Sequence, residues 1–116
     1  MLLCILRVLQ MLLMQKALAE MMGTFSMIFV GVSSMILSEK YPQLFPPMVV
    51  PIAWGTIIGI MIIVWGSTSG AHFNPAVTFA MTLAKRSPLA LLPLYWGSQL
   101  TGGFIAIVAS EVVKKI

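Results

Sequence analysis

The chain has 116 residues, of which 59% are hydrophobic and only 9% are charged, and its formal net charge is +4. A soluble domain usually carries about a quarter of its residues as charges, so much of this apolar surface must face lipid or other membrane helices. One His, one Cys and three well-separated Glu cannot form a metal cage, a catalytic dyad or a disulfide. We therefore expect that the protein is not an enzyme and has no site for a metal or another cofactor. The scattered Lys and Arg are typical of membrane flanks and not of a nucleic-acid-binding surface.

Three apolar blocks predict three membrane-spanning helices, at about residues 17–37, 48–65 and 89–113. At 1.5 Å per residue the first block covers roughly 30 Å, the thickness of the hydrocarbon core. Residues 38–47 hold two charges and three prolines, so their backbone needs water and forms a loop. The four-residue spacing of Gly55 and Gly59 suits close packing of the second span against another helix. The expected fold class is an all-α, multi-pass integral membrane protein.

The stretch between the second and third spans, residues 66–85, is too short and too polar to cross the membrane and return as ordinary helix. Its first half has the small polar composition of irregular backbone. Asn74 is a favoured N-cap, Pro75 suits the first helical position, and a short apolar run follows up to Lys85 and Arg86. This order predicts a re-entrant half-helix, which survives at membrane depth only where it is buried in protein or lines a wet cavity.

Such a half-helix has a definite chemistry at its free end. Its unpaired N–H groups and positive dipole end repel cations, and the Asn74 amide can donate hydrogen bonds to a passing oxygen. The carbonyls of Gly70, Ala71 and His72 can accept from water or hydroxyl groups. An isolated Asn-Pro pair is more often an ordinary capped turn, but the context of residues 69–76 favours a conduit for small uncharged polar solutes.

Residues 69–78, SGAHFNPAVT, resemble the first signature loop of the aquaporin, or major intrinsic protein, family. Residues 19–24, AEMMGT, are similar to the family's pattern on its first span, and residues 93–95, PLY, with Gln99 are similar to its entry to the third. The residues around the Asn-Pro pair, and the Trp-Gly pair at 54–55, are most similar to those of the plant nodulin-like intrinsic proteins. The resemblance covers roughly residues 16–113 and implies one aquaporin-like half repeat.

The resemblance implies roles for individual residues of the pore. Asn74, Pro75 and Ala76 correspond to the first of two Asn-Pro-Ala boxes, with Asn74 at the pore centre. Trp54 corresponds to the outer constriction, where a Trp is typical of glycerol-permeable members. His72 lies beside the path and offers its carbonyl to the single file of solutes.

Each of these roles has a plainer alternative. A Trp in a spanning helix is as often a packing residue or an interface anchor, and a lone His is more often a packed residue than a ligand. Glu20 is expected to be buried as an acceptor for loop N–H groups, because an intramembrane carboxylate needs partners. We expect its donors in residues 68–72.

The chain also departs from the family pattern, because it holds no second Asn-Pro-Ala box and so no second repeat. We therefore expect a truncated half of a channel for water and small uncharged solutes such as glycerol, which conducts only when it pairs with a second half or joins an oligomer of full-length relatives. The alternative is a non-conducting membrane interaction protein that associates with related channel subunits as a homo- or hetero-oligomer. Residues 1–16 form an atypical apolar segment, for which an interfacial helix or a misjoined gene start is favoured over a signal peptide. Whether the plasma membrane or an endomembrane holds the chain stays open.

Overall fold

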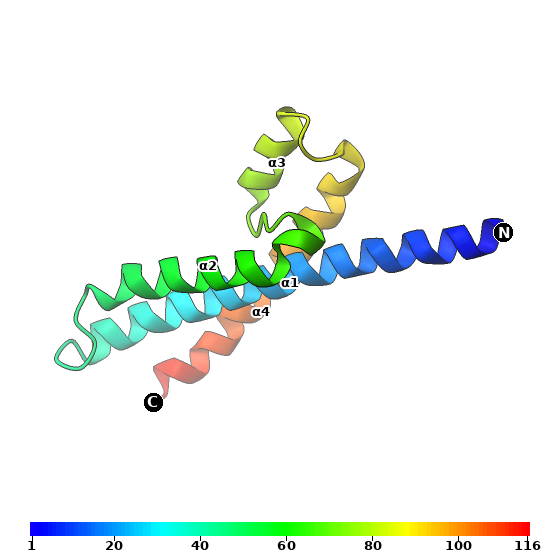
Figure 1. The fold of residues 1–116 in the computed structure, drawn as a ribbon. Coiled ribbons are helices and arrows are strands. Elements are labelled where there is room, and N and C mark those ends of the chain that lie inside the picture. Colours follow the sequence, from blue (N-terminus) through cyan, green and yellow to red (C-terminus); the bar gives the residue numbers. More distant parts are fainter.

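The computed structural model describes residues 1–116 and consists of helices only (Figure 1). In chain order they are α1 (Leu2–Lys40), α2 (Val49–Ser69), α3 (Pro75–Leu83), the 3-10 turn η1 (Leu89–Leu91) and α4 (Leu92–Lys114). Three of the helical segments, formed by α1, by α2 and by η1 with α4, are long and apolar enough to cross a membrane. The expected fold class is thereby confirmed, and the protein is an integral, multi-pass membrane protein.

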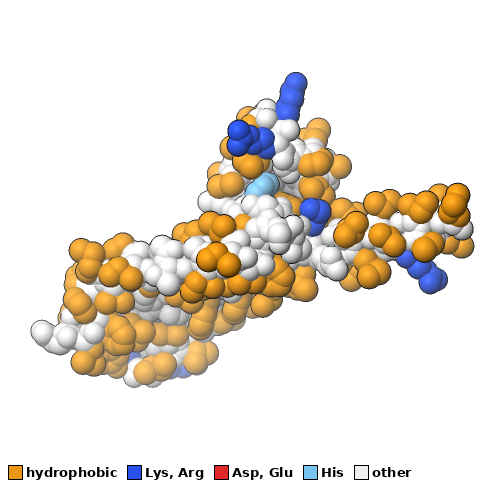
Figure 2. Space-filling view, in the orientation of Figure 1, with side chains coloured by type: hydrophobic (Ala, Val, Ile, Leu, Met, Phe, Trp, Pro, Cys, Tyr) orange, Lys and Arg blue, Asp and Glu red, His pale blue; other side chains and the backbone are white.

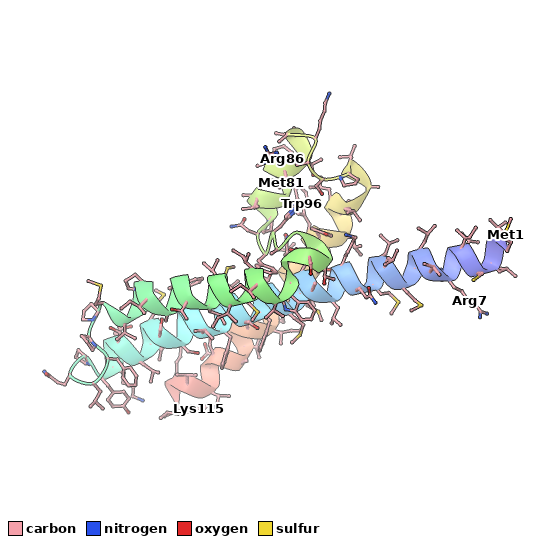
Figure 3. The ribbon with its side chains drawn as sticks, viewed as in Figure 1. Met1, Arg7, Met81, Arg86, Trp96 and Lys115 are labelled. Carbon is pink, nitrogen blue, oxygen red and sulfur yellow. The ribbon has the colours of Figure 1, made fainter.

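Helix α1 is a single uninterrupted rod of 39 residues, about 58 Å long at the α-helical rise. It extends well beyond the span expected at residues 17–37, because no glycine or proline occurs before Gly23 to interrupt it. Its N-terminal part projects away from the other helices, with Met1 at the tip and Arg7 on the projecting part (Figure 3). Hydrophobic side chains cover this projection (Figure 2) and are exposed.

Helices α2 and α4 both pack along α1, and α3 packs on α4. Gly102 of α4 is buried against α1, where an added Cβ would overlap the backbone carbonyl of Met21. A glycine at this crossing lets the two backbones touch, as is usual where membrane helices pack closely. Gly55 and Gly59 of α2 pack on no other helix of this chain, because no other part of the chain lies within 4 Å of a Cβ built at either position.

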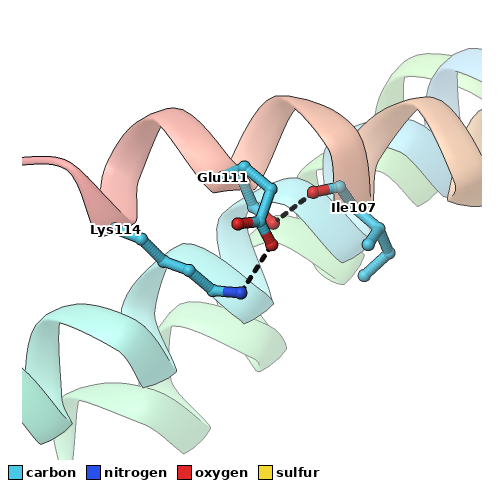
Figure 4. Close-up of polar contacts among 4 residues, drawn as sticks. Ile107, Glu111 and Lys114 are labelled. Carbon is cyan, nitrogen blue, oxygen red and sulfur yellow. Dashed lines mark hydrogen bonds and ion pairs between the residues drawn. The ribbon is translucent and has the colours of Figure 1, made fainter.

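The ends of α2 and α3 define the turn between them. Helix α2 continues past the expected end at residue 65 to Ser69 and stops at Gly70, which has φ +92° in the left-handed region and forms the C-cap. Only residues 70–74 are non-helical before α3 begins. At the far end of α4, Lys114 forms an ion pair with Glu111 on an exposed turn (Figure 4).

Candidate functional site

The turn between α2 and α3 has an unusual backbone. Gly70, Ala71 and Phe73 all have positive φ, of 92°, 53° and 51°. For a residue with a side chain this conformation costs on the order of 1–3 kcal/mol and persists only where the surroundings fix it. The turn therefore needs strong contacts from neighbouring elements.

Glu20 of α1 supplies those contacts. Its side chain is fully buried, and each carboxylate oxygen accepts two hydrogen bonds. Oε1 accepts from the Ser69 hydroxyl at 2.6 Å and from the His72 N–H at 3.0 Å. Oε2 accepts from the Phe73 N–H at 2.7 Å and from Gln99 Nε2 at 2.8 Å. The donors thus include His72 of the expected stretch and reach one residue further, to Phe73.

Thr78 and Gln99 connect this carboxylate to α3 and α4. Both side chains are almost completely buried, and Gln99 Nε2 donates to Thr78 Oγ1 at 2.8 Å as well as to Glu20. Thr78 Oγ1 also donates to the Asn74 carbonyl at 3.2 Å and lies 3.1 Å from His72 Nδ1. Sequence reasoning gave Thr78 no role. The available signal was its position four residues after Asn74, which places both on one face of α3.

Two contacts fix the C-terminal end of α2. The Tyr95 hydroxyl donates to the Ser69 carbonyl at 2.5 Å, and Lys16 Nζ donates to the Thr68 carbonyl at 3.1 Å. A cation beside the last carbonyls of a helix is also favoured by the helix dipole. The turn is therefore held on both sides, by α1 and by α4.

Several polar groups near the N-terminal end of α3 have no partner within the chain. Asn74 caps the helix through Oδ1, which accepts from the Ala76 N–H at 2.8 Å, and Pro75 occupies the first helical position. Asn74 is exposed, so its side-chain NH₂ can donate to another group. No group of the chain donates to the carbonyls of Gly70, Ala71 or His72. The arrangement offers one amide donor and a short series of acceptors beside a positive helix end.

An open groove of about 470 Å³ lies beside Asn74, between α1 and α4. Its walls are mainly apolar, but Thr24 and Gln99 also line it. Thr24 Oγ1 and Gln99 Oε1 are buried and have no hydrogen-bond partner. Buried polar atoms normally have partners, so these two atoms are exceptions beneath the wall of the groove.

Trp54 is not part of this cluster. It lies on α2 at about 22 Å from Ser69 along the helix axis, and its indole packs on Gly31 of α1. Trp96, which sequence reasoning did not single out, lies near the cluster instead (Figure 3): its Nε1 donates to the Pro75 carbonyl at 3.0 Å, next to Phe79.

The Major intrinsic protein family matches residues 7–116. The chain is 42% identical to Probable aquaporin NIP4-2 of Arabidopsis thaliana over 90% of its own length and 37% of the relative's. It is 38% identical to Nodulin-26 of Glycine max over 80% and 34%, and 38% identical to Aquaporin NIP3-1 of Arabidopsis thaliana over 85% and 31%. The chain spans about a third of the length of these relatives. By its sequence, the chain belongs to the major intrinsic protein family of membrane channels.

Proposed function

We propose that residues 17–113 form one repeat of a channel and supply half the wall of a path for water and small uncharged solutes such as glycerol. The observation that carries the proposal is the free end of α3, where the Asn74 amide and the unpaired carbonyls of residues 70–72 lie together. A hydroxyl group can both accept from the amide and donate to the carbonyls. A cation meets the positive end of a helix dipole.

A second half is part of the proposal, because the groove beside Asn74 is open and Asn74 itself is exposed. Facing lipid, an unsatisfied polar group costs several kcal/mol. A complementary segment with a hydrogen-bonding group would cover the groove, pair with the Asn74 amide and close the path. We therefore expect residues 1–116 alone to give no solute flux.

A chimera tests the proposal. Residues 1–116 replace the matching third of Aquaporin NIP3-1, and water and glycerol flux are measured by light scattering in proteoliposomes. We expect flux from the chimera, and flux no greater than that of empty vesicles from residues 1–116 alone. Asn74→Asp should strongly reduce glycerol flux, because it places a charge at the polar end of α3. Glu111→Gln is the control for a changed charge, because this exposed carboxylate pairs with Lys114 at the far end of α4. A silent chimera that is correctly folded and inserted would refute the proposal.

The second candidate is a membrane interaction protein that associates with related channel subunits without conducting. The open positions at Gly55, Gly59 and Gly97 favour it, because small residues without neighbours allow another helix to approach closely. Co-expression of residues 1–116 with Aquaporin NIP3-1, followed by affinity purification from membranes, would detect this association. Recovery of the relative together with a silent chimera would favour this second function.

A further inference from the structure

Gly31 of α1 is in tight contact with the aromatic side chain of Trp54 on α2. Gly31 is buried on α1, and a Cβ built on it would overlap the indole atoms Cε2, Cζ2 and Cδ2 of Trp54. Cδ2 and Cε2 form the bond shared by the two rings. The indole therefore lies with its face against the α1 backbone and not with one edge toward it.

We propose that Gly31 is a positioning residue for solute selection, because it lets the Trp54 indole lie flat against α1. This inference rests on the proposed function and on the role that the family resemblance implies for Trp54, the outer constriction of the path. Carbon atoms in contact sit about 3.5–4.0 Å apart, so a methyl group at Gly31 must push the indole away from α1 by on the order of 1.5 Å. We expect the displaced ring to narrow the path for the larger solute.

The neighbouring glycines separate this role from ordinary helix packing. Gly23 is equally tight against an aromatic ring, but that ring belongs to Phe73 in the turn before α3, and Gly23 lies about 12 Å from Gly31 along α1. Gly59 lies on α2 itself and its added Cβ meets nothing within 4 Å. Gly23→Ala is therefore a control for general overpacking, and Gly59→Ala is a control for an added methyl group on a helix of the same pair.

The first experiment reads the position of Trp54 directly in the 116-residue chain. The chain holds three tryptophans, Trp54, Trp65 and Trp96, so labelling with 5-fluorotryptophan gives three fluorine resonances, which single Trp→Phe variants assign. In lipid nanodiscs, we expect Gly31→Ala to shift the resonance of Trp54 while those of the other two tryptophans stay in place. Neither control variant should move the Trp54 signal. A Trp54 resonance that Gly31→Ala leaves unmoved overturns the inference, whatever the chain conducts.

The second experiment measures selection in the chimera with Aquaporin NIP3-1. We expect Gly31→Ala to lower the ratio of glycerol to water flux on the order of tenfold, the effect of about one methylene group in a tight apolar site. In a Trp54→Ala background the same change should have no effect on the ratio. Equal losses of water and glycerol flux, or a Gly31→Ala effect that survives removal of the indole, would overturn the inference. A wild-type chimera without flux refutes the proposed function instead, and the fluorine shift still decides whether Gly31 positions Trp54.

Discussion

Replacing Glu20 by Gln and by Leu tests what holds the re-entrant turn in place. The carboxylate accepts four hydrogen bonds, two on each oxygen. Gln keeps one oxygen, which can serve two of the donors, and the Ser69 hydroxyl can rotate to accept from the new NH₂ group. One of the four donors then stays unpaired, at a cost of about 1–3 kcal/mol.

Leu is a much larger change, because it removes both oxygens. The N–H groups of His72 and Phe73 and one hydrogen of the Gln99 amide then lose their acceptor. At about 1–3 kcal/mol for each buried donor, the total is about 3–9 kcal/mol. That cost is comparable to the whole folding free energy of a typical domain, about 5–15 kcal/mol. We expect the turn to open in Glu20→Leu while α1 and α2 remain helical.

Hydrogen exchange in lipid nanodiscs, followed by mass spectrometry of peptides covering residues 70–74, measures these costs. We expect Glu20→Gln to speed exchange on the order of 10- to 100-fold and Glu20→Leu to remove protection of this segment. Glu111→Gln is the control, because this exposed carboxylate contacts Lys114 only. Slow exchange in the Leu variant, or equal exchange in the Gln and Leu variants, would refute the assignment of Glu20 as the anchor of the turn.

Three further predictions concern the constriction, the helix crossing and the end of α2. In the chimera, Trp54→Ala should raise the passage of bulkier polyols and Trp54→His should favour water over glycerol, since these side chains leave more room or more hydrogen bonding; unchanged flux ratios for both would assign Trp54 to packing. Gly102→Ala should lower the unfolding free energy in micelles by about 1–3 kcal/mol through overpacking, and no loss would contradict the close crossing of α1 and α4. Lys16→Met should speed exchange at residues 66–70 by a few-fold, from a loss of about 0.3–1 kcal/mol, whereas Lys16→Arg should not.

The sequence predicted those features of the fold that depend on local composition. Apolar length indicated three spans, and the order Asn74, Pro75 and a short apolar run indicated the half-helix, because capping depends on a few adjacent residues. The backbone of the turn could not be read in this way. Ala71 and Phe73 have positive φ, which their side chains disfavour, so tertiary contacts with Glu20 must impose it.

Sequence reasoning also could not identify contact partners that are far apart in the chain. The cost of a buried carboxylate predicted donors for Glu20, but Gln99 comes from a helix 79 positions further along the chain. The spacing of Gly55 and Gly59 showed that they share a face of α2, yet periodicity does not say which element covers that face. Gly31 belongs to no such pair of glycines four residues apart, yet it makes the tight contact with α2.

The contacts of Glu20 also determine which polar groups the turn leaves free. Both oxygens of the carboxylate bind backbone N–H groups, so the donors of His72 and Phe73 are used inside the bundle. The carbonyls of residues 70–72 have no donor within the chain. One buried anion thus divides the turn into paired donors and free acceptors, while the Asn74 NH₂ at the positive end of α3 remains the available donor. Under the proposed function, a solute at this end of α3 must therefore both donate and accept hydrogen bonds. We propose that water and polyols pass because they meet this requirement without charge, whereas a cation, which cannot accept, does not.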